Sequence, residues 1–185
     1  RSWAAWSRAI GMLLPPLRVA DLGCGEGYLA IEASRWASTV IAVDRSSDML
    51  DAARRRVQDL PNVDVRRGEL EALPIQDGAL DAATLLLVLH HLPDPAEALA
   101  EASRVLRPGG RLLISDMLPH DRETYRQQMG HVWLGFSADA IQKLLVSAGF
   151  DRVRIAAMPA DPDAKGPALF VAGATRAERT VQNNN

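Results

Sequence analysis

The stretch VADLGCGEGYLA, residues 19–30, sets three glycines between a short apolar run and an apolar helical pattern. Residues 18–22 are predicted to form a β-strand and residues 28–36 a helix. Glycines at such a turn let backbone N–H groups approach a ligand, because no Cβ stands in the way. A dinucleotide fingerprint needs its third glycine at position 28, which is Tyr28, so the spacing argues against NAD. The stretch therefore predicts a loop that binds a small polar ligand.

Short apolar runs and helical patterns alternate through the rest of the chain. Strands are predicted at residues 39–43, 63–67, 80–87 and 111–116, and helices at residues 46–60, 94–106, 123–129 and 137–148. Pro108-Gly109-Gly110 is expected to be a turn, and the runs 153–157 and 168–174 predict a terminal antiparallel pair. This order predicts an α/β fold with a doubly wound, mostly parallel seven-stranded sheet and a C-terminal antiparallel hairpin. Such sheets bind ligands beyond the carboxyl ends of their strands.

The length of 185 residues fits one globular domain. We expect this domain at residues 1–175, with an N-terminal helix in 1–16, a core in 17–150 and the strand pair in 151–175. Residues 176–185 are expected to be a tail. Trp3 and Trp6 of the first helix either close over the ligand or pack on the sheet.

Charge and cysteine content exclude several classes of function. Lys and Arg number 21 against 23 Asp and Glu, which predicts no direct binding of nucleic acid or of an anionic membrane. The longest apolar stretch, residues 85–89, is too short to cross a membrane. Cys24 is the single cysteine, so neither an internal disulfide nor a cysteine-based zinc cluster can form. A cytoplasmic location is expected.

Two aspartates are placed to contact the ligand of the glycine loop. Asp44 ends the second predicted strand, where an acidic side chain can accept hydrogen bonds from both hydroxyls of a ribose. Asp21 directly precedes the loop and supplies a carboxylate near a bound ammonium group. A phosphate ligand would be repelled there.

These features, with Gly68 and Glu69 after the third strand, resemble the S-adenosylmethionine (SAM) dependent methyltransferases of the class I fold over about residues 19–150. Within them, HHLPDPAEALAEASRVLRPGGRLLISD, residues 90–116, resembles the small-molecule methyltransferases of the ubiquinone/menaquinone biosynthesis type. The resemblance implies SAM as cofactor, S-adenosylhomocysteine as product and a small-molecule methyl acceptor.

The resemblance also implies which residues bind the cofactor. Asp21, Gly23, Cys24 and Gly25 match the loop that lines the amino-acid moiety, Asp44 the ribose ligand, Arg45 and Met49 the adenine flanks, and Glu69 and Leu70 the adenine edge. Leu86 at the end of the fourth strand is expected beside the cofactor too, and with Leu85 it makes the acceptor side apolar.

A narrower likeness concerns YRQQMGHVWLGFSADAIQKLLVSAGF, residues 125–150. It resembles the C-terminal segment of methyltransferase-like domains fused behind an ArsR-type winged-helix repressor. This implies that a DNA-binding domain precedes the chain in a longer protein, and leaves a homodimer open. Arsenic methylation is disfavoured, because those enzymes use several cysteines.

The histidines have two readings each. His90 and His91 follow the fourth strand, where an imidazole could accept a proton from an acceptor or serve only as a structural strut. His91 is our candidate base. His120, Asp121 and His131 match no compact metal site, so no metal is expected. Trp133 and Phe136 form either a substrate wall or ordinary core.

Two functions are compatible with these residues. An enzyme would align the methyl group of SAM with an acceptor, which requires few catalytic side chains. A sensor would bind SAM or S-adenosylhomocysteine without turnover and report it to a fused regulatory domain. The loop spacing disfavours a third class, the NAD-dependent oxidoreductases.

Overall fold

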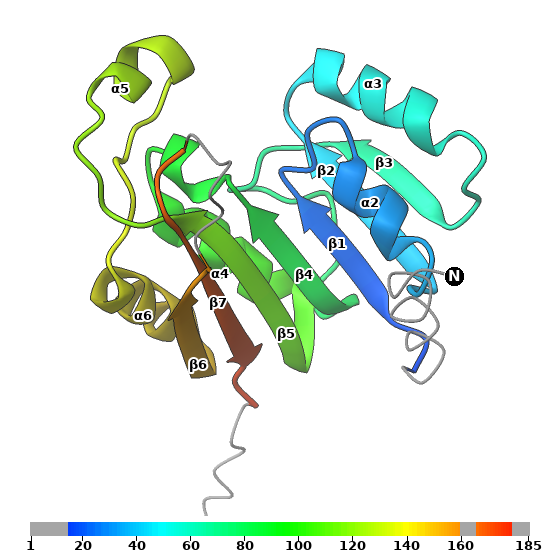
Figure 1. The fold of residues 1–185 in the computed structure, drawn as a ribbon. Coiled ribbons are helices and arrows are strands. Elements are labelled where there is room, and N and C mark those ends of the chain that lie inside the picture. The colour runs from blue at the N-terminus through cyan, green and yellow to red at the C-terminus, as the bar shows by residue number, and fades with distance from the viewer. Residues whose placement is uncertain (1–14, 160–165, 179–185) are drawn as a thin grey trace, which may run out of the picture.

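A computed structural model describes residues 15–159 and 166–178 (Figure 1). Its centre is a seven-stranded sheet with the strand order β3-β2-β1-β4-β5-β7-β6. The strands are β1 (Arg18–Leu22), β2 (Thr39–Asp44), β3 (Val63–Arg67), β4 (Leu80–Leu86), β5 (Leu106–Met117), β6 (Phe150–Ala157) and β7 (Leu169–Arg176). The predicted doubly wound α/β fold is confirmed. The predicted N-terminal helix, with Trp3 and Trp6, lies outside the described residues.

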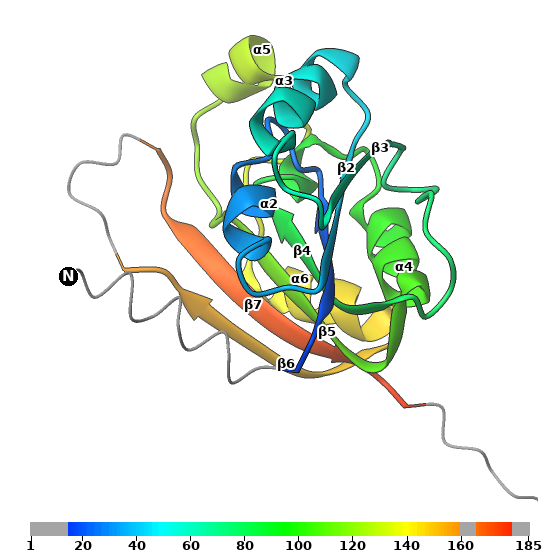
Figure 2. The same cartoon turned by 90° about the vertical axis from the view of Figure 1, so that its right-hand side faces the viewer.

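Helices cover the two faces of this sheet. They are α2 (Tyr28–Ala33), α3 (Ser47–Val57), the short 3₁₀ helix η2 (Leu89–His91), α4 (Pro95–Val105), α5 (Thr124–Met129) and α6 (Ala138–Ser147). Figure 2 shows α2 on one face and α4 and α6 on the other. The predicted caps are confirmed, because Ser46, Asp94 and Ser137 each accept a backbone N–H in the first turn of α3, α4 and α6. No helix in the described ranges is both long and apolar enough to cross a membrane.

The first five strands run parallel and the last two run antiparallel to their neighbours. β7 lies between β5 and β6, so the terminal pair joins the sheet through its second strand. β6 begins at Phe150, directly after Gly149, earlier than the predicted residue 153.

The prediction of a turn at residues 108–110 was wrong. β5 already begins at Leu106, which pairs with Leu80, and the register then shifts so that Arg111 pairs with Ala82. Gly109 has a φ of 75°, which an L side chain rarely adopts, so the three turn residues form an irregularity inside a strand. Glycine is common both in turns and in irregular positions of strands, so the sequence does not separate the two. The residues on both sides of 108–110 pair with β4, which places these residues within β5.

Two buried clusters hold the helices on the sheet. The larger contains Leu22, Leu85, Leu99, Ile114 and Ile141 and lies under α4 and α6. The smaller contains Val19, Cys24, Ala30, Val40 and Leu50 and lies under α2 and α3. Alternate side chains of the central strands therefore serve opposite faces.

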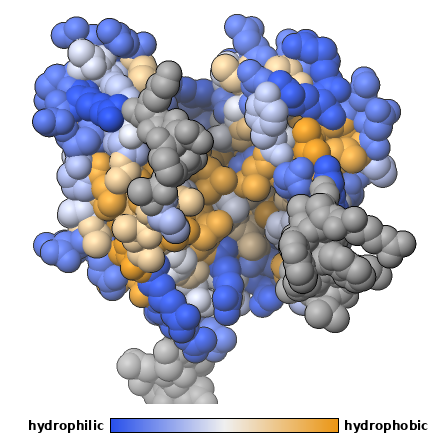
Figure 3. Space-filling view, viewed as in Figure 1, coloured by the Kyte–Doolittle hydropathy of each residue, from blue (hydrophilic) through white to orange (hydrophobic). Residues whose placement is uncertain are grey.

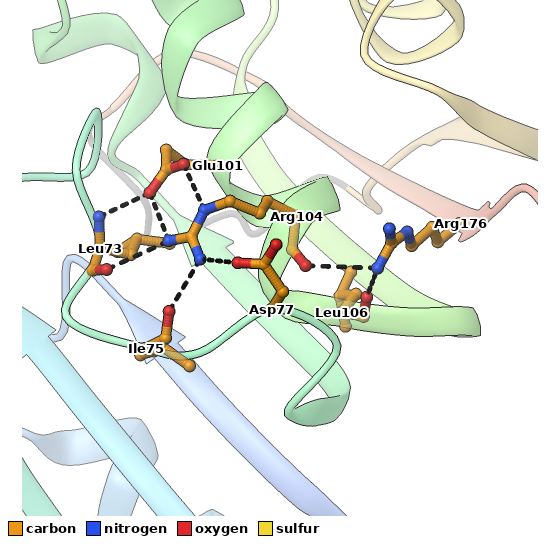
Figure 4. A network of polar contacts seen from close by, with 7 residues as sticks. All are labelled: Leu73, Ile75, Asp77, Glu101, Arg104, Leu106 and Arg176. Atoms are coloured by element: carbon orange, nitrogen blue, oxygen red, sulfur yellow. Dashed lines mark hydrogen bonds and ion pairs between the residues drawn. The ribbon is translucent and has the colours of Figure 1, made fainter.

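Arg104 of α4 fixes the loop between β3 and β4 (Figure 4). Its guanidinium donates to the carboxylates of Glu101 and Asp77 and to the carbonyls of Leu73 and Ile75. Glu101 in turn accepts the N–H of Leu73 at 2.7 Å. These contacts hold the loop whose first residues, 68–71, reach the functional site.

Candidate functional site

A cleft of about 480 Å³ opens at the carboxyl ends of the parallel strands. In Figure 3 the surface is hollowed at the top, between α5 on the left and α3 on the right. This edge is where the strand order reverses between β1 and β4, the place at which doubly wound sheets bind ligands. The cleft is lined by Gly23, Gly25, Asp44, Arg45, Ser46, Met49, Gly68, Glu69, Leu70, Glu71, Leu87, Val88, His91, Leu92, Met129 and Gly130.

The glycine loop forms one wall of the cleft. The N–H groups of Gly23 and Cys24 both donate to the carbonyl of Val43, which ties the loop to β2. Gly23 has a φ of 79°, and a Cβ there would lie 2.6 Å from Cγ2 of Val88. Gly25 has a φ of 51°, and a Cβ there would meet nothing within 4 Å. The loop thus needs glycine at position 23 for packing, and at Gly25 it leaves space at the cleft.

Asp44 lies at the meeting point of the loop and the next helix. Its Oδ2 accepts the N–H of Gly25 at 2.9 Å and its Oδ1 accepts the N–H of Ser46 at 2.9 Å. Each carboxylate oxygen retains a further lone pair. The side chain is half-buried at the cleft, so a ligand can use that remaining capacity.

Asp21 is buried behind the loop, at the end of β1. Its Oδ1 accepts the hydroxyl of Thr84 at 3.2 Å, while its Oδ2 has no hydrogen-bond partner among the described residues. Burial raises the pKa of Asp21 to about 6, against a lowering by the Thr84 hydroxyl and a further rise from the nearby Asp44. An unpartnered buried oxygen of this kind is typical of a position that a bound cation completes.

The opposite wall carries the residues predicted for adenine. Arg45 lies between β2 and α3, and Met49 lies in the first turn of α3. Glu69 and Leu70 come from the loop after β3. Glu69 and Leu70 follow Gly68, where a Cβ would lie 2.5 Å from Cδ of Pro74. Glu69, the predicted acidic position, and Leu70, the predicted apolar position, therefore line the cleft side by side on one loop.

The end of the cleft beside η2 and α5 is lined by Leu87, Val88, His91, Leu92, Met129 and Gly130. His91 is half-buried there, and its Nδ1 lies 3.4 Å from the carbonyl oxygen of Gly130. Desolvation lowers the pKa of His91, and His90 lowers it further. His90 lies behind it, 2% exposed, and its Nδ1 donates to Oδ1 of Asp116 at 2.8 Å.

Three predicted site residues are not among those that line the cleft. Leu86 lines another hollow, on the α2 face of the sheet beside Leu113, because its side chain alternates with that of the buried Leu85. Leu87 and Val88 occupy the cleft instead. Asp21 and Cys24 lie behind the loop, and burial raises the pKa of the Cys24 thiol to about 12, as do Asp21 and Asp44.

Sequence reasoning missed several lining residues. Ser46, Glu71, Leu87, Val88, Leu92, Met129 and Gly130 all line the cleft. Proximity to Asp44 could have identified Ser46. Met129 and Gly130 had no such signal, because only the tertiary fold brings the end of α5 to the strand ends. For Trp133 and Phe136 the sequence left a substrate wall and ordinary core as alternatives. Phe136 is buried in the larger cluster, and Trp133 donates its Nε1–H to the carbonyl of Leu92.

Known proteins resemble this chain along most of its length. The sequence profile of the family described as "Methyltransferase domain" matches residues 20–114. An uncharacterised 37.1 kDa protein of transposon TN4556 from Streptomyces fradiae is 48% identical over 99 residues, which are 52% of this chain and 29% of that protein. The arsenite methyltransferase of Halobacterium salinarum is 32% identical over 160 residues, 80% of this chain and 41% of that protein. The chain thus spans less than half the length of either relative.

The fold has close counterparts among solved structures. The crystal structure of an S-adenosylmethionine-dependent methyltransferase from Mesorhizobium loti aligns with a TM-score of 0.75 and 24% identity. The alignment covers 94% of this chain and 98% of that one. The likeness extends over the parallel sheet and the terminal antiparallel strands alike.

Proposed function

This chain belongs to the family of methyltransferase domains, and on that premise we propose that it binds SAM in the cleft and transfers the methyl group to a small-molecule acceptor. The observation that carries the proposal is the position of Asp44. Its carboxylate joins the glycine loop to α3 through Gly25 and Ser46, and still has an acceptor position on each oxygen. The two hydroxyls of a ribose require such a pair of acceptors.

The other parts of SAM match the rest of the cleft. The unpartnered Oδ2 of Asp21 suits the ammonium group of the amino-acid moiety, directly or through a water molecule. The open space at Gly25 leaves room for that moiety beside the loop. Met49 is exposed and Leu70 lies on the same wall, so the flat adenine ring gains apolar contacts while Glu69 accepts from its amino group.

SAM supplies, when bound, a methyl group on a positively charged sulfur that an acceptor can displace. The protein's task is then to align the acceptor and to exclude water. Val88 and Leu92 line the cleft beside His91 and are buried apolar side chains, which suits that exclusion. No protein nucleophile is required.

We assign to His91 the contact with the acceptor. Its imidazole lines the cleft, and desolvation lowers its pKa below the ordinary value of 6.5, so the ring is neutral at pH 7. A neutral imidazole can accept the proton that an acceptor hydroxyl or amine must lose. His90 cannot share this role directly, because it is buried behind His91 and bonded to Asp116.

Arsenite is a poor match as acceptor, despite the similarity to an arsenite methyltransferase. The chain has one cysteine, and the high pKa of the buried Cys24 keeps it a thiol at neutral pH. Trivalent arsenic requires several thiolate ligands. We therefore propose an organic acceptor.

The wider context is also a proposal. The two relatives are much longer than their matched segments, which agrees with a DNA-binding domain beside this one in a longer cytoplasmic protein. A methyl transfer activity and a regulatory domain are compatible in one chain.

Calorimetric titration with SAM, S-adenosylhomocysteine and NAD tests the binding step. We expect micromolar-scale binding of the first two and none of NAD. Tight NAD binding without SAM binding would overturn the proposal. Incubation with radiolabelled SAM and cell extract tests transfer: label in a small molecule supports the enzyme, and SAM binding without any transfer favours the sensor.

A further inference from the structure

Three of the four histidines of the chain gather at the acceptor end of the cleft. His90, His91 and His131 each present a ring nitrogen within 4.8 Å of the others. The ring centroid of His90 lies 4.1 Å from that of His91 and 4.2 Å from that of His131. The sequence analysis expected no metal site, because it compared His131 with His120 and Asp121, whose spacing matches no compact site.

The backbone holds the three rings together. The carbonyl oxygen of His90 accepts the N–H groups of Val132 at 2.8 Å and Trp133 at 3.1 Å. Nδ1 of His91 lies beside the carbonyl of Gly130 on the same segment. The segment after α5 is therefore attached to η2 on both sides of His131.

Asp116 orients His90. The carboxylate accepts Nδ1–H of His90 and the backbone N–H groups of His90 and Met117, and the residue is fully buried. Because Nδ1 donates to Asp116, Nε2 of His90 keeps its lone pair. A carboxylate behind an imidazole is the arrangement that fixes histidine ligands of metal ions.

His131 has an unsatisfied ring nitrogen. The residue is 4% exposed, and its Nδ1 has no hydrogen-bond partner in the described part of the chain. Leaving a buried polar atom unpaired destabilises the fold. A coordinated ion would satisfy this atom.

We propose that His90, His91 and His131 bind a divalent transition-metal ion, of which Zn²⁺ is the best match. Imidazole nitrogens suit Zn²⁺, and three protein ligands leave a fourth position open. Zn–N bonds of about 2.0–2.1 Å place tetrahedral ligands ~3.4 Å apart. The nitrogens now lie at most 4.8 Å apart, so binding of an ion requires the three rings to move closer together.

The ion would border the SAM cleft, because His91 lines it. If the proposed methyl transfer holds, the open position takes the oxygen or sulfur of the acceptor. Coordination lowers the acceptor's pKa and its proton passes to solvent. The bound anion then attacks the methyl carbon of SAM, the bond from that carbon to sulfur breaks, and S-adenosylhomocysteine leaves. In that case His91 is a ligand of the ion in place of the proton acceptor proposed above, and removing the metal lowers turnover as removing His91 does.

Cobalt titration tests the site directly. The chain is produced without a polyhistidine tag, stripped with a chelator and titrated with Co²⁺. We expect visible absorption bands of low-coordinate Co²⁺ that saturate at one ion per chain and disappear when Zn²⁺ is added. His131→Ala and His91→Ala should abolish the bands. Asp116→Asn should weaken binding by about 10–100-fold.

His120→Ala is the matched control, because its ring also has a buried unpartnered nitrogen but lies outside the cluster. It should keep the wild-type Co²⁺ spectrum. SAM titration of each variant verifies the fold. The metal site would be overturned if the wild type bound Co²⁺ only weakly and no substitution in the cluster changed that binding. Equal loss of the Co²⁺ bands in His120→Ala would overturn it too. Failure of SAM binding with intact Co²⁺ bands would instead overturn the proposed function alone.

Discussion

The carboxylate of Asp44 accepts the backbone N–H of Gly25 at 2.9 Å, which joins the end of β2 to the glycine loop that follows β1. The bond fixes the Asp44 carboxylate, the proposed ribose ligand, and the loop relative to each other. Asp44→Ala should weaken SAM binding by about 1–3 kcal/mol, because the hydroxyls lose a charged acceptor and the Gly25 amide loses its partner. Calorimetry measures the change. Asp48→Ala is the control, because Asp48 is an exposed acid in the first turn of α3 that does not line the cleft. If both substitutions changed SAM affinity equally, Asp44 would not be the ribose ligand.

Asp21 should make SAM binding dependent on pH. Its pKa of about 6 in the free protein means that it is protonated below pH 6, and a bound ammonium favours the ionised form. We expect SAM affinity to rise between about pH 5 and 7 and then level off, with proton release detectable by calorimetry in buffers of different ionisation enthalpy. Asp21→Asn should remove this dependence. A flat profile for the wild-type chain would separate Asp21 from the ammonium.

The same shift predicts a stability effect in the unliganded protein. Because the folded pKa lies above the ordinary value of 3.8, the stabilising contribution of protonated Asp21 is complete below pH 3.8 and is lost as pH rises through 6. Asp21→Asn should therefore raise the free energy of unfolding at pH 7.5 by about 1–3 kcal/mol and leave it nearly unchanged at about pH 4. Urea unfolding at the two pH values measures both. A variant that is less stable at pH 7.5 would contradict the raised pKa.

Gly23 should tolerate no side chain, in contrast to Cys24. Gly23→Val forces a β-branched residue to a φ of 79° and brings its Cβ to 2.6 Å from Val88. We expect lost SAM binding and a free energy of unfolding lowered by more than about 2 kcal/mol, whereas Cys24→Ser should stay near wild type. The double variant Gly23→Ala/Val88→Ala should be more stable than Gly23→Ala alone, because removal of the Val88 side chain relieves the steric contact. It should remain less stable than the wild type, because the positive φ of residue 23 is unchanged. Equal tolerance at both positions would show that the loop is wrongly placed.

His91→Ala should lower kcat by about 10²–10⁴-fold and leave SAM affinity near wild type. In the wild type, kcat/KM should fall as pH decreases through a value below 6.5, because the neutral imidazole is required and its pKa is lowered. His120→Ala provides a matched control. Label transferred equally by the wild type and His91→Ala would reject the role of His91 but keep the enzyme.

Arg104→Met should loosen the loop that carries Glu69 and Leu70. The substitution keeps the length of the side chain and removes the bonds to two carboxylates and two carbonyls (Figure 4). We expect a free energy of unfolding lower by about 1–3 kcal/mol and weaker SAM binding. Arg107→Met is the control, since Arg107 is exposed and its ion pair is with Asp81 alone. Unchanged binding with lowered stability would confine Arg104 to a structural role.

Local sequence determined the glycine loop, the bounds of β1 and β3 and the helix caps. The glycines at 23, 25 and 27 all have positive φ, and Ser46, Asp94 and Ser137 cap the helices that they were predicted to begin. These features depend on neighbours a few residues away, so their physical causes are visible in the sequence. The parallel sheet followed from the alternation of strands and helices.

Tertiary structure alone decided which side chains meet. Pairing with β4 turned the expected turn at Gly109 into a bulge, and strand alternation directed Leu86 away from the cleft. Burial of Asp21, and the approach of His131 to His90 through backbone bonds from the segment after α5, both depend on contacts between residues far apart in sequence. Such contacts depend on packing and hydrogen bonding across elements, for which a single sequence carries no local pattern. The proposed metal site is accordingly a property of the fold.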